Sequence, residues 1–244
     1  MNLFTVLSPR LITLGLLLAF TGAGLKANPA DAILERYLEV SGGRAQIEAI
    51  RDVVMEGEVR MNTFGVRGDI VMALKSPDKV MMELQLPGIG RMVSAYNGKI
   101  AWSHDPIQGY RQISDEEARQ MRDFSSLQKM LDFRQTYPVR RLRGAEEING
   151  QIFDVVDLQT AEGDQMTLKF RRQDGLPTIL ETEVNMGPGG TIKMTAISHD
   201  FQRVNGILFP FRVEIRHPVM PMEMVFSDIR INVGVQDGTF EHRP

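Results

Sequence analysis

The segment VVMEGEVRMN, residues 53–62, alternates apolar and polar side chains. Val53, Met55, Val59 and Met61 are its main apolar members. A period of two places successive side chains on opposite faces of a β-strand, so the segment predicts a strand with one buried face. The same pattern returns near residues 70–74 and 80–86, which indicates several neighbouring strands of one sheet.

Turn signals separate the later apolar runs. Asn97-Gly98, Asn149-Gly150 and Asn205-Gly206 favour two-residue hairpins, because asparagine and glycine adopt a left-handed backbone readily. The GPGG segment at 187–190 predicts another turn. Gly88-Ile89-Gly90 lacks the third glycine of a dinucleotide fingerprint and is interpreted as a hairpin loop. These signals predict about eleven strands.

Three helices are expected beside the sheet. Asn28 caps the first, which ends at Gly42-Gly43, and a second short helix contains residues 47–50. The SDEE segment at 114–117 is a capping box and predicts a helix to Leu131, in the middle of the strand sequence. Because no helix separates most strands, the order excludes alternating βαβ architecture. It predicts a mainly β (α+β) fold with an antiparallel sheet.

The N-terminal residues have the pattern of a secretory signal peptide. Arg10 precedes an apolar run at 11–20, which is short for a membrane span, and small residues follow it. Cleavage is expected after Ala27, with Ala23 as a competing position and an uncleaved anchor as the alternative. Residues 1–27 are therefore expected to be the signal peptide and residues 28–244 one exported domain.

Composition excludes several classes of site. The chain has 244 residues, 43% of them hydrophobic and 24% charged, with a formal net charge of −3 and no cysteine. Without cysteine there is no disulfide, thiolate nucleophile, cysteine-bound zinc or iron–sulfur cluster. The slight negative charge argues against a nucleic-acid partner, which usually requires a basic surplus.

No catalytic or metal-binding pattern is present. The four histidines are not at metal-ligand spacing, and GxSxG and phosphate-loop motifs are absent from the sequence. The acidic pair at 116–117 is interpreted as part of a helix first turn, and the pair at 146–147 as a solvated strand or loop. We therefore expect no enzyme, no cofactor and no metal.

The expected helices are too few to cover the apolar strand faces. A helix is about 10 Å wide and strands are about 4.8 Å apart, so three helices cover about six strands. The remaining apolar surface must curl onto itself, meet another protein or hold a ligand. Methionine is also frequent, with 15 residues. Its flexible side chain suits a surface that meets variable acyl chains, although a ligand-free methionine-rich core is the alternative.

Candidate residues for a lipid-binding cavity are the apolar side chains of these strand faces, together with the single tryptophan, which could line the cavity mouth or fill the core. They are Met55, Val59, Met72, Val80, Met82, Leu84, Met92, Trp102, Met166, Phe170, Met194, Phe209 and Met224. Candidates for a lid come from the mid-chain helix. They are Met121, Phe124, Leu127 and Leu131.

Several short motifs follow one another along nearly the whole expected mature chain. They are ILERYL at 33–38 with SGG at 41–43, MEG at 55–57, NGKIAW at 97–102, NG at 149–150, DGLP at 174–177, VNGI at 204–207 and FP at 209–210. In this order they resemble the outer-membrane lipoprotein-sorting proteins, the LolA/LolB-like group. Each motif alone is mainly turn chemistry, so the resemblance rests on their order.

The resemblance implies a strongly curved antiparallel sheet, an incomplete barrel, with a few helices lying over its hollow as a lid. It also implies a chaperone-like periplasmic carrier. Such a carrier binds acyl chains of lipoproteins or other lipids in a hydrophobic cavity and moves them toward the outer membrane. Its partners would be donor and acceptor proteins of the inner and outer membranes. No cofactor is implied.

Two points remain open within the resemblance. The family's carrier latches its lid with an arginine, and Arg60, Arg67 and Arg91 are all candidates here. The alternative function is a periplasmic lipoprotein-sensing or regulatory interaction protein of the same fold, which is less favoured because such regulators contain a second domain. The missing lipobox cysteine favours a soluble shuttle over an anchored receptor.

Overall fold

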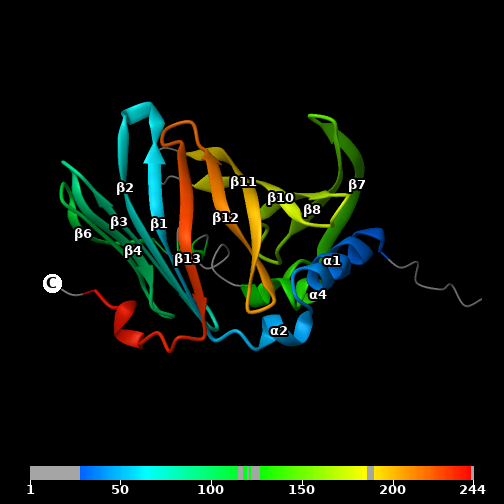
Figure 1. Cartoon of the computed structure of the whole chain (residues 1–244), viewed down its shortest axis with the longest axis horizontal. Coiled ribbons are helices and arrows are strands. Elements are labelled where there is room, and N and C mark those ends of the chain that lie inside the picture. The colour runs from blue at the N-terminus through cyan, green and yellow to red at the C-terminus, as the bar shows by residue number, and fades with distance from the viewer. Residues whose placement is uncertain (1–27, 115–117, 120, 122–126, 186–189, 243–244) are drawn as a thin grey trace, which may run out of the picture.

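In this computed structural model, residues 28–114, 118–119, 121, 127–185 and 190–242 are described, and their strands form one curved sheet (Figure 1). All neighbouring strands are antiparallel. The sheet is an incomplete barrel, because its edge strands β6 (Gly109–Gln112) and β7 (Val139–Ile148) do not pair with each other. The predicted fold class is thereby confirmed.

The first and last strands meet in the middle of the sheet. The order is β6-β5-β4-β3-β2-β1-β13-β12-β11-β10-β9-β8-β7, so each half is a simple meander. The remaining strands complete the set of thirteen, two more than predicted. They are β1 (Asp52–Met61), β2 (Val66–Lys75), β3 (Lys79–Leu86), β4 (Gly90–Tyr96), β5 (Ala101–Asp105), β8 (Gln151–Gln159), β9 (Gln165–Arg171), β10 (Pro177–Asn185), β11 (Thr191–Val204), β12 (Ile207–Arg216) and β13 (Met222–Ile231).

The labelled α-helices are short and lie near one end of the sheet. Asn28 caps the first as predicted, since its side-chain oxygen accepts a hydrogen bond from the backbone nitrogen of Ala30 at 3.0 Å. The α-helices are α1 (Pro29–Val40), α2 (Arg44–Glu48) and α4 (Phe133–Thr136), and the 3-10 helices are η1 (Asn62–Phe64), η2 (Leu127–Met130) and η4 (Asp237–Thr239). In the part described, no helix is both long and apolar enough to cross a membrane.

Two of the three asparagine–glycine pairs form the predicted two-residue turns. Asn149 and Gly150 join β7 to β8, Asn205 and Gly206 join β11 to β12, and all four residues have positive φ. The third pair is different. Residues 97–100 form a four-residue loop, in which Asn97 Oδ1 accepts hydrogen bonds from the backbone nitrogens of residues 99 and 100. The turn predicted at 187–190 lies almost entirely outside the described residues.

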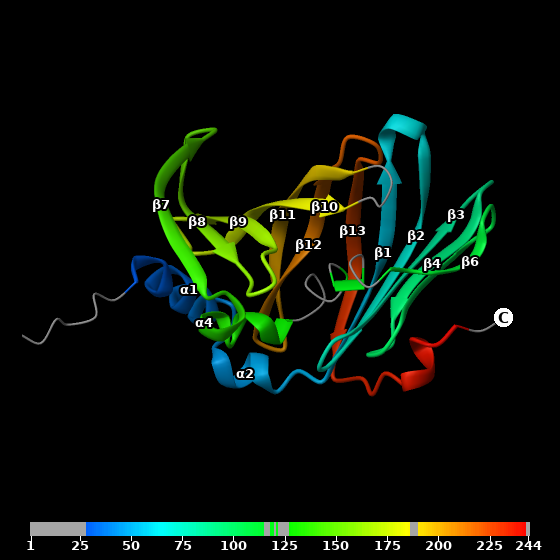
Figure 2. The ribbon, with the colours of Figure 1, turned by 180° about the vertical axis from the view of Figure 1, so that it is seen from behind.

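The sheet has two chemically different faces. We call the side that carries Val53, Met55 and Val59 of β1 the inner face, and the side that carries Glu56 and Glu58 the outer face. Figure 2 looks into the concave, inner side. The main hydrophobic core lies there, where buried residues of α1 pack with Val53 and Val59. The outer face of β2–β5 is covered instead by residues near the C-terminus, around Phe240.

The predicted mid-chain helix is described only in part. Residues 118, 119 and 121 are helical, and η2 follows at 127–130. The capping box predicted at 114–117 lies, apart from Ser114, outside the described residues. Residues 1–27, for which a signal peptide is predicted, also lie outside them, so both interpretations remain predictions.

Candidate functional site

Cross-strand pairing aligns apolar side chains in rows along the inner face. Ile229 of β13 pairs with Met55, Met55 with Met72, and Met72 with Met82. A second row runs through the other half of the sheet from β13 to β8. It consists of Met222, Ile215, Ala196, Leu180, Leu168 and Val156. These two rows make the inner face apolar from β3 through β1 and β13 to β8, whereas the first row continues into β4 and β5 as Ser94 and Ser103.

Much of this face remains partly accessible. The methionines of the first row contact the buried core but are themselves only half-buried, and the same holds for Met92 on β4 and Met222 on β13. Beside them on the same face lie fully buried residues such as Val53 and Ile70. The inner face therefore has a packed, buried part, which we call the floor, and flexible, half-buried apolar side chains beside it, which can rearrange around an apolar ligand.

Twelve of the thirteen cavity candidates lie on the inner face by strand register. Six are half-buried there: Met55, Met72, Met82, Met92, Met166 and Met194. The other six are buried and form part of the floor: Val59, Val80, Leu84, Phe170, Phe209 and Met224. The structure brings these residues together, and their contact with lipid remains a prediction.

Trp102 does not share this face. It pairs with Ala95 on the outer face, where it packs in a buried cluster with Phe240. Its Nε1 donates a hydrogen bond to the carbonyl oxygen of Phe240 at 3.0 Å. Alternation along the strand gives two possible faces, and the partner that selects the outer one lies 138 residues away in the sequence. The interpretation of Trp102 as a cavity-lining residue is therefore wrong, and core filling is correct.

The mid-chain segment is the region of residues 114–131, for which a helix is predicted. Its described residues contact the inner face of the sheet at two places. Met121 packs on a cluster that contains Val80 and Tyr96, while Leu131 packs on the main core near the helices. Of the other lid candidates, Phe124 and the side chain of Leu127 lie outside the description. The segment therefore contacts inner-face residues at two separated places, as a covering segment would.

Arg44, at the start of α2, connects the helices to this segment. Its Nη1 donates to the carbonyl oxygen of Leu131 at 2.6 Å, and its Nη2 donates to Glu35 Oε1 at 2.9 Å. The same Glu35 oxygen accepts a hydrogen bond from Arg134 Nη1 at 2.8 Å. Both guanidinium groups lie near the ring of buried Phe133, with Cζ 6.0 Å and 4.5 Å from its centroid.

The charge of Glu35 stabilises this network. Burial alone would raise the pKa of Glu35, but hydrogen bonds from Arg134 and Arg44 outweigh it and hold the pKa below its usual value. Because the lowered pKa belongs to the folded protein, this contribution is present above the unfolded pKa. It is lost as the pH falls through the folded pKa.

The three arginines considered as lid latches lie elsewhere. Arg60 and Arg67 both pair with Glu58, and Arg91 pairs with Glu83 at 2.8 Å, all on the outer face. The sequence alone did not single out Arg44, because its main acceptor is a backbone carbonyl that no side-chain pattern marks. Arg44 is the arginine that contacts a lid candidate in the described residues.

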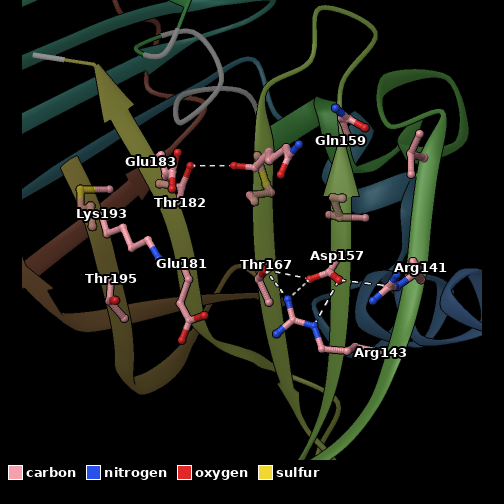
Figure 3. Close-up of a pocket in the computed structure, with 15 residues that line it drawn as sticks. Arg141, Arg143, Asp157, Gln159, Thr167, Glu181, Thr182, Glu183, Lys193 and Thr195 are labelled. Atoms are coloured by element: carbon pink, nitrogen blue, oxygen red, sulfur yellow. Dashed lines mark hydrogen bonds and ion pairs between the residues drawn. The ribbon is translucent and has the colours of Figure 1, made fainter. Parts of the chain in front are cut away.

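A polar groove of about 710 Å³ lies on the outer side of strands β7–β11. Figure 3 shows its centre, where Arg143 donates to Asp157 and Thr167 also donates to Asp157, at 2.5 Å and 2.9 Å. Burial would raise the pKa of Asp157, but these hydrogen bonds and the nearby arginines lower it. Lys169 bridges Glu146 and Glu181 beside it. Paired charges of this kind make the groove unsuitable for an acyl chain.

The part of the chain that the structure describes contains no candidate metal site. There, no group of three or more histidine, aspartate or glutamate side chains is placed to hold a metal ion. The strongest functional feature is therefore the accessible apolar surface of the inner face.

The chain is similar to proteins of known structure in its fold, but comparisons of its sequence find no match. No protein-family model and no curated protein matches the chain. Among solved structures, a DUF1329 family protein from Desulfovibrio piger aligns with a TM-score of 0.61 at 13% identity, covering 88% of this chain and 98% of that one.

Two further solved structures are similar to the chain. A LolA superfamily protein from Nitrosomonas europaea has a TM-score of 0.57 at 15% identity, covering 87% of this chain and 97% of its own. A domain assigned to the outer membrane lipoprotein-sorting proteins, from Vibrio parahaemolyticus, has a TM-score of 0.56 at 15% identity, with 85% and 97% covered. The similarities extend over nearly the full length of these proteins. The chain therefore has a LolA-like fold, as the resemblance implied.

Proposed function

We propose that this protein is a periplasmic carrier that binds acyl chains of lipids or lipoproteins on its inner face and moves them toward the outer membrane. The observation that carries the proposal is the row of half-buried methionines, which leaves apolar surface accessible beside the packed floor. The shared fold with lipoprotein-sorting proteins supports it. On this proposal the chain is a binding protein and not an enzyme.

Burial of apolar surface is sufficient to drive such transport. Each methylene group removed from water contributes about 0.8 kcal/mol, so a few carbons of extra burial set the direction of transfer between donor and acceptor. No nucleotide hydrolysis is required at the carrier. Cargo on the inner face would displace the mid-chain segment, because Met121 and Leu131 contact the same side of the sheet.

A charge placed on the inner face tests the proposal. Met82 is half-buried in the methionine row, so Met82→Glu puts a carboxylate where an acyl chain would lie. Desolvating that carboxylate is costly, and we expect fluorescent fatty acid to bind about tenfold more weakly or worse. Titration of fluorescence against protein concentration measures the change. Leu84→Glu should act in the same direction but also disturb the floor, because Leu84 is buried.

Gln85→Glu is the matched control. Gln85 is exposed on the same strand but on the opposite face, so the variant adds the same charge away from the proposed site. We expect its fatty-acid affinity to equal that of the unmodified protein. Equal affinities for the two folded variants would mean that acyl chains do not bind on the inner face.

A further inference from the structure

Four hairpin turns lie at one end of the sheet. They join β5 to β6, β3 to β4, β1 to β2 and β12 to β13, and these eight strands are consecutive in the sheet. Because antiparallel strands alternate in direction, every second connection lies at the same end. Figures 1 and 2 show the β1–β2 and β12–β13 turns at the upper rim, away from α1 and α2. Strand spacing puts neighbouring turns about 10 Å apart.

Each turn presents a large apolar side chain to solvent. The exposed fractions are 56% for Phe64, 41% for Ile89, 86% for Ile107 and 60% for Val219, which is followed by Met220 at 41%. We call these five the tip residues. They are half of the ten exposed large hydrophobic residues in the described chain. Single exposed apolar residues are ordinary, but one on each of four successive turns at one rim indicates an interaction surface.

Positive charge accompanies every turn. Arg67, Arg91, Arg111 and Arg216 each lie within four residues of a tip residue. The segments 61–67, 86–91, 105–111 and 216–222 contain these four arginines and a single acidic residue, Asp105. The carboxylates that pair with three of the arginines lie nearer the body of the sheet, at positions 58, 83 and 214. The outermost layer of the rim is therefore apolar and cationic.

The backbone nitrogens of four of the five tip residues, all but Phe64, donate hydrogen bonds within their turns. The nitrogen of Ile107 donates to Asp105 Oδ1 at 2.8 Å, and that of Ile89 donates to the carbonyl oxygen of Leu86 at 3.1 Å. In the fourth turn, the nitrogens of residues 219 and 220 both donate to His217 Nδ1, at 3.2 Å and 3.1 Å. Satisfied donors lose little when they leave water.

Proline removes further donors from the same turns. Pro87, Pro106 and Pro218 come one or two residues before a tip residue, and Pro221 follows Met220. Proline has no backbone N–H group, so these positions need no hydrogen-bond partner in a water-poor environment. Three of the four turns are thus chemically suited to enter the boundary between water and lipid.

From these features we infer that the four turns form a docking rim for a lipid bilayer with anionic head groups. The tip residues enter the boundary between head groups and acyl chains, and the arginines bind the phosphates. A protein partner would fit a contiguous apolar patch better, whereas here the apolar side chains stand singly on separate turns. Docking through the rim needs no cargo on the inner face, so the inference goes beyond the proposed function.

Vesicle co-sedimentation tests the rim. The full chain is expressed with its own N-terminal segment, so that processing occurs as in the cell, and is mixed with vesicles of phosphatidylglycerol and phosphatidylethanolamine. We expect it to pellet with these vesicles and much less with phosphatidylcholine vesicles. Raising the salt concentration should weaken the binding, because salt screens the attraction between arginines and phosphates.

The variant Phe64→Ser/Ile89→Ser/Ile107→Ser/Val219→Ser removes the exposed apolar side chain from every turn. We expect it to lose about tenfold or more in vesicle affinity while its fatty-acid binding in solution is unchanged. The matched control is Ile100→Ser/Val139→Ser/Ile152→Ser/Val233→Ser, which removes four other exposed apolar side chains outside the rim. The control should bind vesicles like the unmodified protein.

Several results would overturn the inference. One is no pelleting of the unmodified protein with anionic vesicles, and another is an equal loss of binding in the two fourfold variants. If the unmodified protein bound phosphatidylcholine vesicles as strongly as the anionic vesicles, the role of the arginines would be refuted. If the fourfold rim variant fails to fold, Ile107→Ser alone decides, because that side chain is 86% exposed. It must then reduce vesicle binding, and unchanged binding contradicts the rim. Failure of fatty-acid binding would instead count against the carrier proposal only.

Discussion

Single residues determine how closely the two halves of the sheet approach. Gly57 lies in the centre of the inner face, opposite Phe226 and beside an irregularity in the pairing of β1 with β13. A Cβ atom at this position would lie 2.1 Å from the carbonyl oxygen of Val225. The site therefore requires glycine because the neighbouring backbone occupies the space of a side chain.

Replacing this glycine should weaken the fold. We expect Gly57→Ala to lower the free energy of unfolding by about 3 kcal/mol or more, because backbone atoms must move to relieve the overlap. Gly163→Ala is the comparison, since a Cβ there meets no atom within 4 Å and only the positive φ is unfavourable. That variant should lose about 1–2 kcal/mol. Urea denaturation measures both, and equal losses would show that the overlap at Gly57 is unimportant.

Residue patterns predicted some local features and failed at others for physical reasons. Asn149-Gly150 and Asn205-Gly206 form the predicted turns because both residues take positive φ, a local property. At Asn97 the side chain instead caps the loop through two backbone nitrogens, which lengthens it. The face of Trp102 depends on Phe240, and such long-range packing has no local signal.

At the scale of elements, the helices were easier to predict than their contacts. The cap at Asn28 and the apolar stripe after it gave α1 correctly. The pairing of β1 with β13, which joins the two meanders, depends on residues more than 160 positions apart and could not be read from periodicity. The contact of α2 with the mid-chain segment through Arg44 is also long-range, and its acceptor is a backbone carbonyl.

Arg44 should hold the segment 127–136 against the helices. In Arg44→Ala, the hydrogen bond to Leu131 and the ion pair with Glu35 are lost, so amide hydrogen exchange in this segment should rise about fivefold. Arg51→Ala is the control, because the guanidinium of Arg51 donates a hydrogen bond to the nearby carbonyl oxygen of Glu48 and not to the segment 127–136 as the structure describes it. Exchange that is equally slow in both variants would show that Arg44 does not secure the segment.

At the scale of the whole molecule, the most informative prediction was that the helices are too few to cover the apolar faces of the strands. Thirteen strands and only a few short helices leave inner-face side chains such as Met55, Met72 and Met82 half-buried. A sheet that closed fully would bury this surface, whereas the open arrangement of β6 and β7 leaves it accessible. The apolar inner face and the rim of turns are separate surfaces of the same sheet, one suited to acyl chains and the other to a membrane.

The most direct test of acyl-chain binding is to identify what the protein carries. The protein is purified from the periplasm without detergent, examined by native mass spectrometry, and extracted with organic solvent for lipid analysis. The account predicts an additional mass on part of the protein and acyl-containing species in the extract. Repeated preparations that contain no lipid and take up no fluorescent fatty acid would contradict it.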